Sequence, residues 1–147
     1  MNKTTTELVA ELNQVKNTLE LEHFLKHNDT ELKRDSFGDG VLKLCSKYEM
    51  TPSVLQTRIA ISKSQFYSLL NGTRKPNKES VVKVSFGLGI TRDEMNSLLR
   101  AAGCHALDPR NKEDAIIIFG IENKREIEKV AELLKEYGSK IRLLDRE

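Results

Sequence analysis

The sequence predicts an all-α protein, and two features carry that prediction. In several separate segments, apolar residues recur at the three- and four-residue spacing of one helix face, and a residue that commonly caps helices precedes most of them. The 147 residues include only three prolines and eight glycines, so few positions interrupt a helix. The one continuous β-branched run has no second segment to pair with as a strand. We therefore expect helices along the whole chain.

Length and composition restrict the class of protein further. A chain of 147 residues buries one good core, or one core with a small appendage. No run approaches the roughly eighteen consecutive apolar residues of a membrane span, and the polar N-terminus lacks the apolar stretch of a secretory signal. Cys45 and Cys104 fall in different predicted elements, as expected of reduced thiols. These features predict a cytoplasmic protein with no membrane contact.

Residues 1–35 are predicted to form a separable N-terminal helical appendage. Thr4 and Glu7 have the spacing of a capping box, in which each side chain bonds the main-chain N–H of the other residue. The apolar residues that follow at helical intervals are Leu8, Leu12, Val15 and Leu19, with Phe24 and Leu25 in a further short helical stretch. That stretch is expected to end near His27, and the polar run 28–35 is expected to be a connection.

Five more helices are predicted in a domain at residues 36–102. The first begins at Ser36 and turns inward Val41, Leu44, Cys45 and Tyr48. Thr51, Ser62 and Asn77 are positioned to cap the next three, and Thr91 with Glu94 forms a capping box for the fifth. The inward residues of the fourth and fifth helices are Val81, Val82, Val84 and Phe86, followed by Met95, Leu98 and Leu99.

The second and third of these helices have the layout of a helix-turn-helix. Pro52 lies in the first turn, where its missing N–H costs nothing. The predicted inward residues are Val54, Leu55 and Ile59 in the second helix, and Phe66, Leu69 and Leu70 in the third. The outer face of the third helix, over residues 62–70, carries Lys63, Ser64, Gln65, Tyr67 and Ser68, and Asn71-Gly72 ends the helix. A small polar and basic face of this kind suits the major groove of DNA.

Positive charge is concentrated in the same segment. Residues 51–78 contain five basic side chains and no acidic one, whereas the residues before them have a net charge of −2 and those after them −1. A local excess of Lys and Arg is typical of a surface that binds phosphate groups. The alternative is a basic face that meets only solvent.

Residues 37–101 resemble the Cro/repressor family of helix-turn-helix domains, the lambda-repressor-like fold. Leu55 and Ile59 match core positions of that family. The other matching stretches are Met50-Thr51, Ile61-Ser62 and Gly72-Thr73-Arg74-Lys75-Pro76. Two positions depart from the family pattern, because Gln56 stands where Ala is favoured and Ala60 where Gly is favoured. We expect these departures to affect how the two helices pack, unless Gln56 forms a hydrogen bond at the surface.

The resemblance implies a sequence-specific regulator of transcription, of bacterial or phage type, that binds double-stranded DNA. Carried over position by position, the residues expected to reach base edges are Lys63, Ser64 and Ser68. Those expected to contact the DNA backbone are Thr51, Gln65, Tyr67, Asn71, Arg74 and Lys75. Two alternatives stay open: Lys63 as a solvated first-turn residue, and Asn71 as a helix terminator only.

The remaining residues, 103–147, are predicted to be a helical extension. Asp108 and Pro109 have the character of an N-cap and a first helical residue for a helix over residues 114–121. The apolar run 115–119 is also compatible with a buried strand, but we favour the helix because a strand would have no partner. Residues 103–138 are similar to a helical extension that follows the same motif in other bacterial proteins. The last helix presents the stripe Ile127, Val130, Ala131, Leu134 and Tyr137, closed by Gly138.

Assembly and catalysis can also be addressed from the sequence. One motif reads only about half a turn of groove, and the apolar residues Leu8, Leu12, Val15, Ile127, Val130 and Leu134 must be buried against something. Either region could fold back on its own domain. We nevertheless expect a homodimer joined through the C-terminal helices. His23 and His27 lie one helical turn apart, but without further ligands at a recognisable spacing they are not expected to bind a metal. Adjacent residues such as Cys104 and His105 rarely face each other as nucleophile and base. We expect no enzyme activity, no cofactor and no metal.

The hypothesis that competes with DNA binding is a protein-interaction adaptor with a vestigial motif, which binds a protein partner through residues 1–35.

Overall fold

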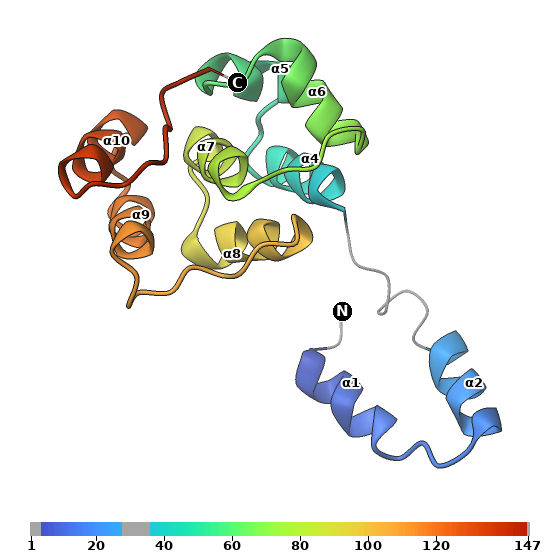
Figure 1. Ribbon diagram of the computed structural model, residues 1–147. Helices are drawn as coiled ribbons and strands as arrows, with labels where there is room; N and C mark the ends of the chain where they lie inside the picture. Colours follow the sequence, from blue (N-terminus) through green and yellow to red (C-terminus); the bar gives the residue numbers. More distant parts are fainter. Residues whose placement is uncertain (1–3, 28–35, 147) are drawn as a thin grey trace. The chain divides into compact units, whose positions relative to one another are not determined.

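The computed structural model describes residues 4–27 and 36–146, and its contacts divide the chain into two units, Met1–Arg34 and Asp35–Glu147. All regular secondary structure in these two ranges is α-helical (Figure 1), which confirms the predicted all-α class. None of the described helices has both the length and the apolar character needed to cross a lipid bilayer.

The first unit contains α1 (Thr5–Leu12) and α2 (Thr18–His27). The capping box is confirmed, since Thr4 Oγ1 accepts from Glu7 N at 3.1 Å and Glu7 Oε2 accepts from Thr4 N at 3.4 Å. The helical repeat expected to continue from Leu8 to Leu19 is interrupted between the two helices, where Asn17 Oδ1 accepts from Glu20 N at 2.8 Å and starts a new helix instead. No side chain described in this unit is buried. The side chains of Phe24, Leu25, His23 and His27, and the connection 28–35, lie outside the described residues.

The second unit begins with the five helices expected between residues 36 and 102. They are α4 (Phe37–Lys47), α5 (Pro52–Arg58), α6 (Lys63–Asn71), α7 (Lys78–Leu88) and α8 (Arg92–Ala101). Their N-cap residues Ser36, Thr51, Asn77 and Thr91 each accept a hydrogen bond from the main-chain N–H three residues later. Ser62 occupies the N-cap of α6, but its side chain makes no capping hydrogen bond.

Helix α7 lies among the other four, in contact with α4, α5 and α8 (Figure 1). Val81, Val82 and Val84 are fully buried on it. Gly87 allows α5 to approach closely, because a Cβ atom there would lie 2.5 Å from Ile59 Cγ2 and 2.8 Å from Leu55 Cδ1. The position of α5 therefore depends directly on the packing of its two core residues against α7.

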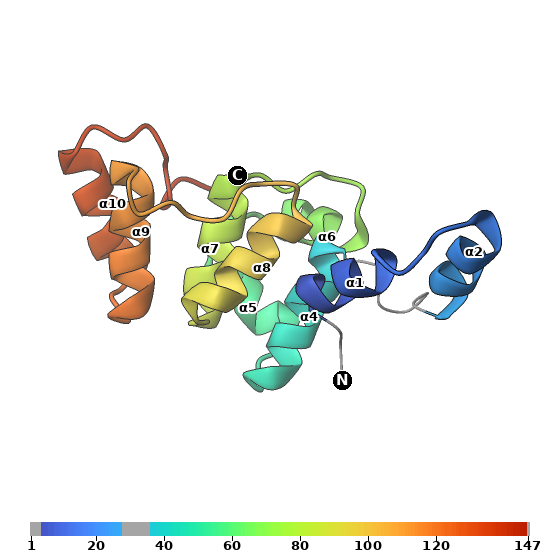
Figure 2. The same ribbon diagram turned by 90° about the horizontal axis from the view of Figure 1, so that it is seen from below.

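The C-terminal part contains α9 (Lys112–Glu122) and α10 (Ile127–Glu136), which lie side by side in both ribbon views (Figures 1 and 2). The run 115–119 is helical, as we favoured. The predicted N-cap at Asp108 is wrong: Asn111 caps α9 by accepting from Asp114 N at 3.1 Å, while the Asp108 carboxylate binds Arg110. Gly120 lets the two helices meet, since a Cβ there would lie 2.3 Å from Val130 Cγ2.

One hydrophobic core runs through the second unit and includes residues from α4 to the segment after α10. Val130 and Leu134 are fully buried in it, and Ile127 packs against it. Ile127, Val130 and Leu134 of the stripe are thus covered by their own chain, which is the alternative to a dimer contact, whereas Tyr137 stays exposed. Beyond α10, Leu143 is only 1% exposed and joins the same core.

Candidate nucleic-acid interface

Helix α6 is held by a buried face and presents a polar one. Phe66 and Leu69 are buried, which orients the helix against the core. Among the residues predicted to read bases, Lys63 and Ser64 are exposed and Ser68 is half-buried. Gln65 is half-buried, and Tyr67 is exposed with its ring edge-to-face on Phe66, at 5.4 Å between centroids. The structure therefore gathers the predicted outer-face residues along one accessible side of α6.

The connection between α5 and α6, residues 59–62, is tied together by the side chain of Gln56. Its Nε2 donates to the carbonyl oxygen of Ile61 at 3.0 Å, so the first departure from the family pattern has a structural role. The second departure costs no backbone strain, because Ala60 is not among the residues with positive φ. Ile61 itself is fully buried and anchors the start of α6.

The first turn of α6 has unused donors. The first main-chain N–H groups of any helix lack intrahelical acceptors, and the side chain of Ser62 does not supply one. No acidic side chain lies in this turn, and Lys63 adds a positive charge to it. Such a helix start attracts an anion through its N–H groups, its dipole and the lysine together.

The end of α6 is closed by a local network. Gly72 takes the left-handed conformation at φ +84°, and Asn71 Oδ1 accepts from both Thr73 N at 3.0 Å and Thr73 Oγ1 at 2.7 Å. The oxygen of Asn71 therefore has the helix-terminating role left open above, and only its amide NH₂ is available to an outside partner. Lys75 is exposed beyond this turn and Arg74 is half-buried.

The N-terminus of α5 contributes Thr51, which is exposed and caps the helix by accepting from Val54 N at 3.2 Å. Val54 was expected to point inward, but its side chain is 43% exposed. Leu55 and Ile59, one turn apart, define the buried face, and Val54 lies about 100° away from Leu55 around a helix axis.

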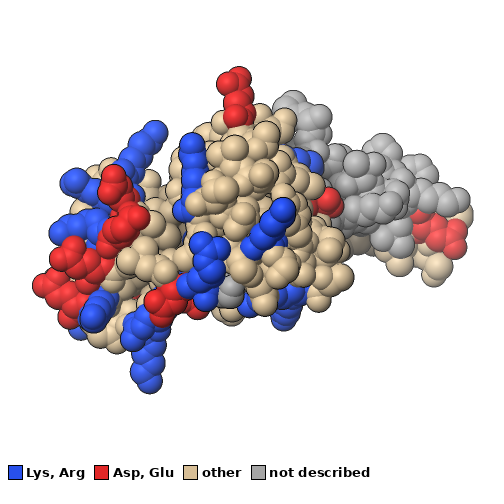
Figure 3. Space-filling model, turned by 90° about the horizontal axis from the view of Figure 1, so that it is seen from above, with Lys and Arg blue, Asp and Glu red and all other residues tan. Residues whose placement is uncertain are grey.

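Lys78, one of the five basic residues of the motif, is neutralised by acidic side chains. Lys78 Nζ is paired with Glu113 at 2.7 Å and with Asp114, both on α9. The other basic side chains of this segment are Arg58, Lys63, Arg74 and Lys75. Figure 3 shows the side of the molecule that carries α5 and α6, where Lys and Arg stand on a largely uncharged surface, while acidic side chains gather among basic ones toward α9 and α10.

Sequence reasoning missed two side chains near this interface, Lys83 and Arg146. Lys83, in the apolar run of α7, is only 1% exposed, and its Nζ donates to the carbonyls of Ala60 at 3.2 Å and Asp145 at 2.7 Å. Arg146 Nη1 donates to the carbonyl of Ile61 at 3.4 Å. No local pattern marks these contacts, because the partners lie 23 to 85 residues apart.

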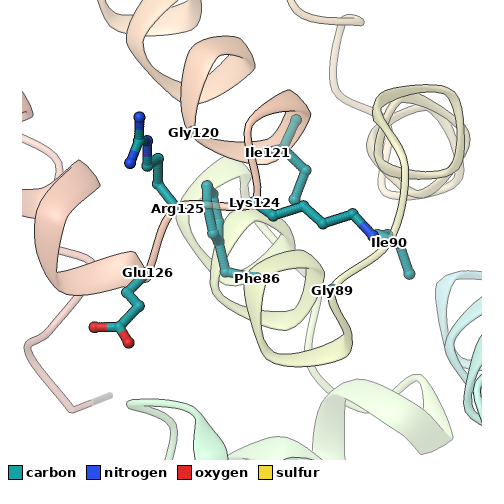
Figure 4. A pocket seen from close by; sticks show the side chains of 8 residues that line it. All are labelled: Phe86, Gly89, Ile90, Gly120, Ile121, Lys124, Arg125 and Glu126. Carbon is teal, nitrogen blue, oxygen red and sulfur yellow. The ribbon is translucent and has the colours of Figure 1, made fainter.

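The part of the chain that the structure describes also contains a pocket whose lining includes no residue of α5 or α6. A pocket of about 240 Å³ between α7 and α9 has an apolar floor around Phe86 and exposed charges at its rim (Figure 4), where Lys124 extends toward Ile90 and Arg125 and Glu126 lie on the other side. Its wall contains no Ser, Cys or His. Cys45 is buried, which raises the pKa of its thiol, and His105 is exposed in a loop. Among the described residues, no three His, Cys, Asp or Glu side chains are grouped to hold a metal ion.

Comparison of the chain with protein-family models, curated proteins and solved structures gave no match. A function is therefore inferred from the geometry and charge of the α5–α6 surface.

Proposed function

We propose that this chain is a sequence-specific, double-stranded-DNA-binding regulator of transcription, of bacterial or phage type, with a lambda-repressor-like arrangement of α4–α8. In this proposal α6 enters the major groove and α5 lies across it. The observation that carries the proposal is the first turn of α6, which has an exposed lysine, no capping side chain from Ser62 and no acidic side chain, and which follows the buried Ile61.

Each side chain of the surface has a distinct role in the proposal. Lys63 addresses the O6 and N7 acceptors of guanine, and Ser64 and Ser68 are weaker discriminators beside it. Gln65 and Tyr67 lie along the groove wall. Thr51, Asn71, Arg74 and Lys75 contact phosphates on either side, which fixes the position of the protein without reading sequence.

The experiment that tests this proposal has two stages. Selection from a random DNA pool first yields a preferred site, and fluorescence anisotropy then compares that site with scrambled DNA at two salt concentrations. Replacing Arg74 and Lys75 together by alanine should weaken binding to both DNAs and lower the salt slope by roughly two. The matched control replaces Lys135 and Lys140, two exposed lysines outside the motif, and should leave the slope unchanged. If no preferred site can be selected, the proposal of sequence-specific DNA binding is ruled out.

A homodimer is part of the proposal, because a single motif contacts too little DNA for a specific operator. The stripe of α10 is occupied by its own core, so we place the contact at the apolar side chains still exposed on the C-terminal helices, Phe119 at 43% and Tyr137 at 62%. Light scattering at micromolar concentration, with and without DNA, should give a dimeric mass. A mass that stays monomeric in both conditions removes the dimer.

One observation favours the adaptor as a second candidate function. Val9, Leu12 and Leu19 of the first unit are 46–77% exposed, so this unit has apolar side chains but no core of its own among the described residues. A protein partner of apolar surface would bury them. The salt dependence of binding distinguishes the two functions, because the affinity of phosphate contacts falls steeply as the salt concentration rises whereas that of apolar contacts does not.

A further inference from the structure

The segment after α10, residues 139–146, returns to the turn that precedes α6 (Figure 1). Ser139 Oγ donates to Glu113 Oε2 at 2.7 Å, and Arg142 N donates to Glu79 Oε1 at 2.6 Å, so the segment is held at α9 and at the start of α7. Leu143 is buried, whereas its neighbour Leu144 is 52% exposed. At its far end, Arg146 reaches the carbonyl of Ile61.

Lys83 joins this segment to the α5–α6 turn. Its ammonium is buried in the core and donates to one carbonyl from each side, Ala60 of the turn and Asp145 of the segment. A buried charge is strongly unfavourable unless hydrogen bonds replace its lost hydration. If the segment leaves, the ammonium loses the Asp145 carbonyl, and this disturbs the same ammonium that donates to Ala60.

We propose that residues 143–146 act as a positioning element for α6, with Lys83 as the positioning residue between them. Docking of the segment fixes the α5–α6 turn, and the fixed turn holds the first residues of α6 in the orientation that reads bases. The inference rests on the proposed DNA binding and extends it. Docking of the segment and specific DNA binding stabilise each other, because both favour the same arrangement of the turn.

The test compares two neighbouring leucines in the full chain. Leu143→Ala removes the buried anchor, and Leu144→Ala removes the same atoms from an exposed position. Two quantities are measured: amide hydrogen exchange across residues 59–64 in the free protein, and affinity for the selected site and for scrambled DNA. Leu143→Ala should accelerate exchange in the turn and weaken binding to the selected site about tenfold, with scrambled DNA bound as before. Leu144→Ala should match the wild type in both.

A mutant cycle with Lys83→Met tests whether the segment acts through the lysine. This substitution keeps the apolar stem and removes the ammonium, and thermal melting establishes that the variant is folded. We expect Lys83→Met to reproduce the loss of site preference, and the double variant to be no worse than Lys83→Met alone, because both changes break one linkage. Effects that add in full overturn the linkage.

Other results also overturn the inference. If Leu143→Ala leaves exchange in the turn unchanged, the segment does not fix it. If exchange rises but the preference for the selected site is that of the wild type, the turn does not control base reading. A general loss of stability would weaken binding to both DNAs equally, and that result also counts against positioning. Absence of any selected site for the wild type is a different failure, since it removes the proposed function itself.

Discussion

The side-chain amide of Gln56 donates a hydrogen bond to the carbonyl oxygen of Ile61 at 3.0 Å, across the turn between α5 and α6. A half-buried polar side chain at this position is stabilised because its donor meets a main-chain acceptor. The carbonyls of the α5–α6 turn thus accept three side-chain hydrogen bonds. Gln56 and Arg146 donate to Ile61, and Lys83 donates to Ala60.

Replacing Gln56 tests the value of that hydrogen bond. Gln56→Ala should lower the free energy of unfolding by about 0.5–1.5 kcal/mol, because the bond is lost. Gln56→Glu should cost more, since a carboxylate cannot donate and would lie against the carbonyl oxygen. Urea denaturation at neutral pH measures both. If alanine stabilises the protein, packing rather than hydrogen bonding governs this position.

Two glycines of α4, Gly38 and Gly40, lie in the same helix but have different amounts of space for a side chain. A Cβ at Gly38 would lie 2.0 Å from the carbonyl oxygen of Leu70, at the end of α6, whereas one at Gly40 would lie 3.0 Å from a movable methyl of Leu98. Gly38→Ala should destabilise the protein by about 1–3 kcal/mol, because main chain must shift. Gly40→Ala should be close to neutral, since a helix-propensity gain of up to about 1 kcal/mol offsets the tight contact. Equal thermal shifts for the two variants would contradict this packing.

The lowered pKa of Glu94 predicts that the free energy of unfolding decreases in acid. Burial favours the neutral form of its carboxyl, but hydrogen bonds from Lys47, Thr91 and Tyr48 outweigh burial and lower its pKa from 4.5 to about 2. The carboxylate therefore stabilises the fold fully above pH 4.5, and this contribution, about 1–3 kcal/mol, is lost as the pH falls toward 2.

The measurement is urea denaturation between pH 6 and pH 2 for the wild type and Glu94→Gln. Glutamine can still bond the N-cap backbone, so the variant removes charge and keeps the capping geometry. Its stability should vary less with pH over this range than that of the wild type. Asp93→Asn, at the exposed neighbouring position, is the control and should keep the wild-type profile.

Lys63 is the sharpest test of base reading. Lys63→Ala should cost about 1–3 kcal/mol at the selected site and relax the preference at one base pair. Lys112→Ala removes an equivalent exposed lysine from the first position of α9 and should leave affinity unchanged. An unaltered preference after repeated selection with Lys63→Ala would rule out this docking of α6.

Deleting residues 1–34 tests the independence of the first unit. Because the contacts separate Met1–Arg34 from Asp35–Glu147, the remaining chain should melt cooperatively and bind the selected site as before. Pull-down with the deleted segment as bait then asks whether it holds a protein partner. Loss of folding or of DNA affinity on deletion would instead make the segment part of the second unit.

Local patterns were enough to predict most helices, because their causes act over three or four residues. Thr51, Asn77 and Thr91 cap helices where a side-chain oxygen stands three residues before a free N–H. The buried faces of α6 and α8 follow from apolar spacing alone. Local patterns failed where two possible caps or helix boundaries compete. Asn111 rather than Asp108 caps α9, and the helix ends between α1 and α2 although the apolar spacing continues.

The sequence by itself determined the all-α class, the helix ends set by caps and the polar face of α6, since each depends on neighbours along the chain. Only the tertiary structure decided that Lys78 forms an ion pair with α9 and that Val130 and Leu134 of α10 are buried in the core of their own chain. It also decided that Lys83 donates hydrogen bonds to two main-chain carbonyls. The physical reason is the same in each case: a charge or an apolar face is balanced by whichever group folding brings to it, and those groups lie far away in the chain.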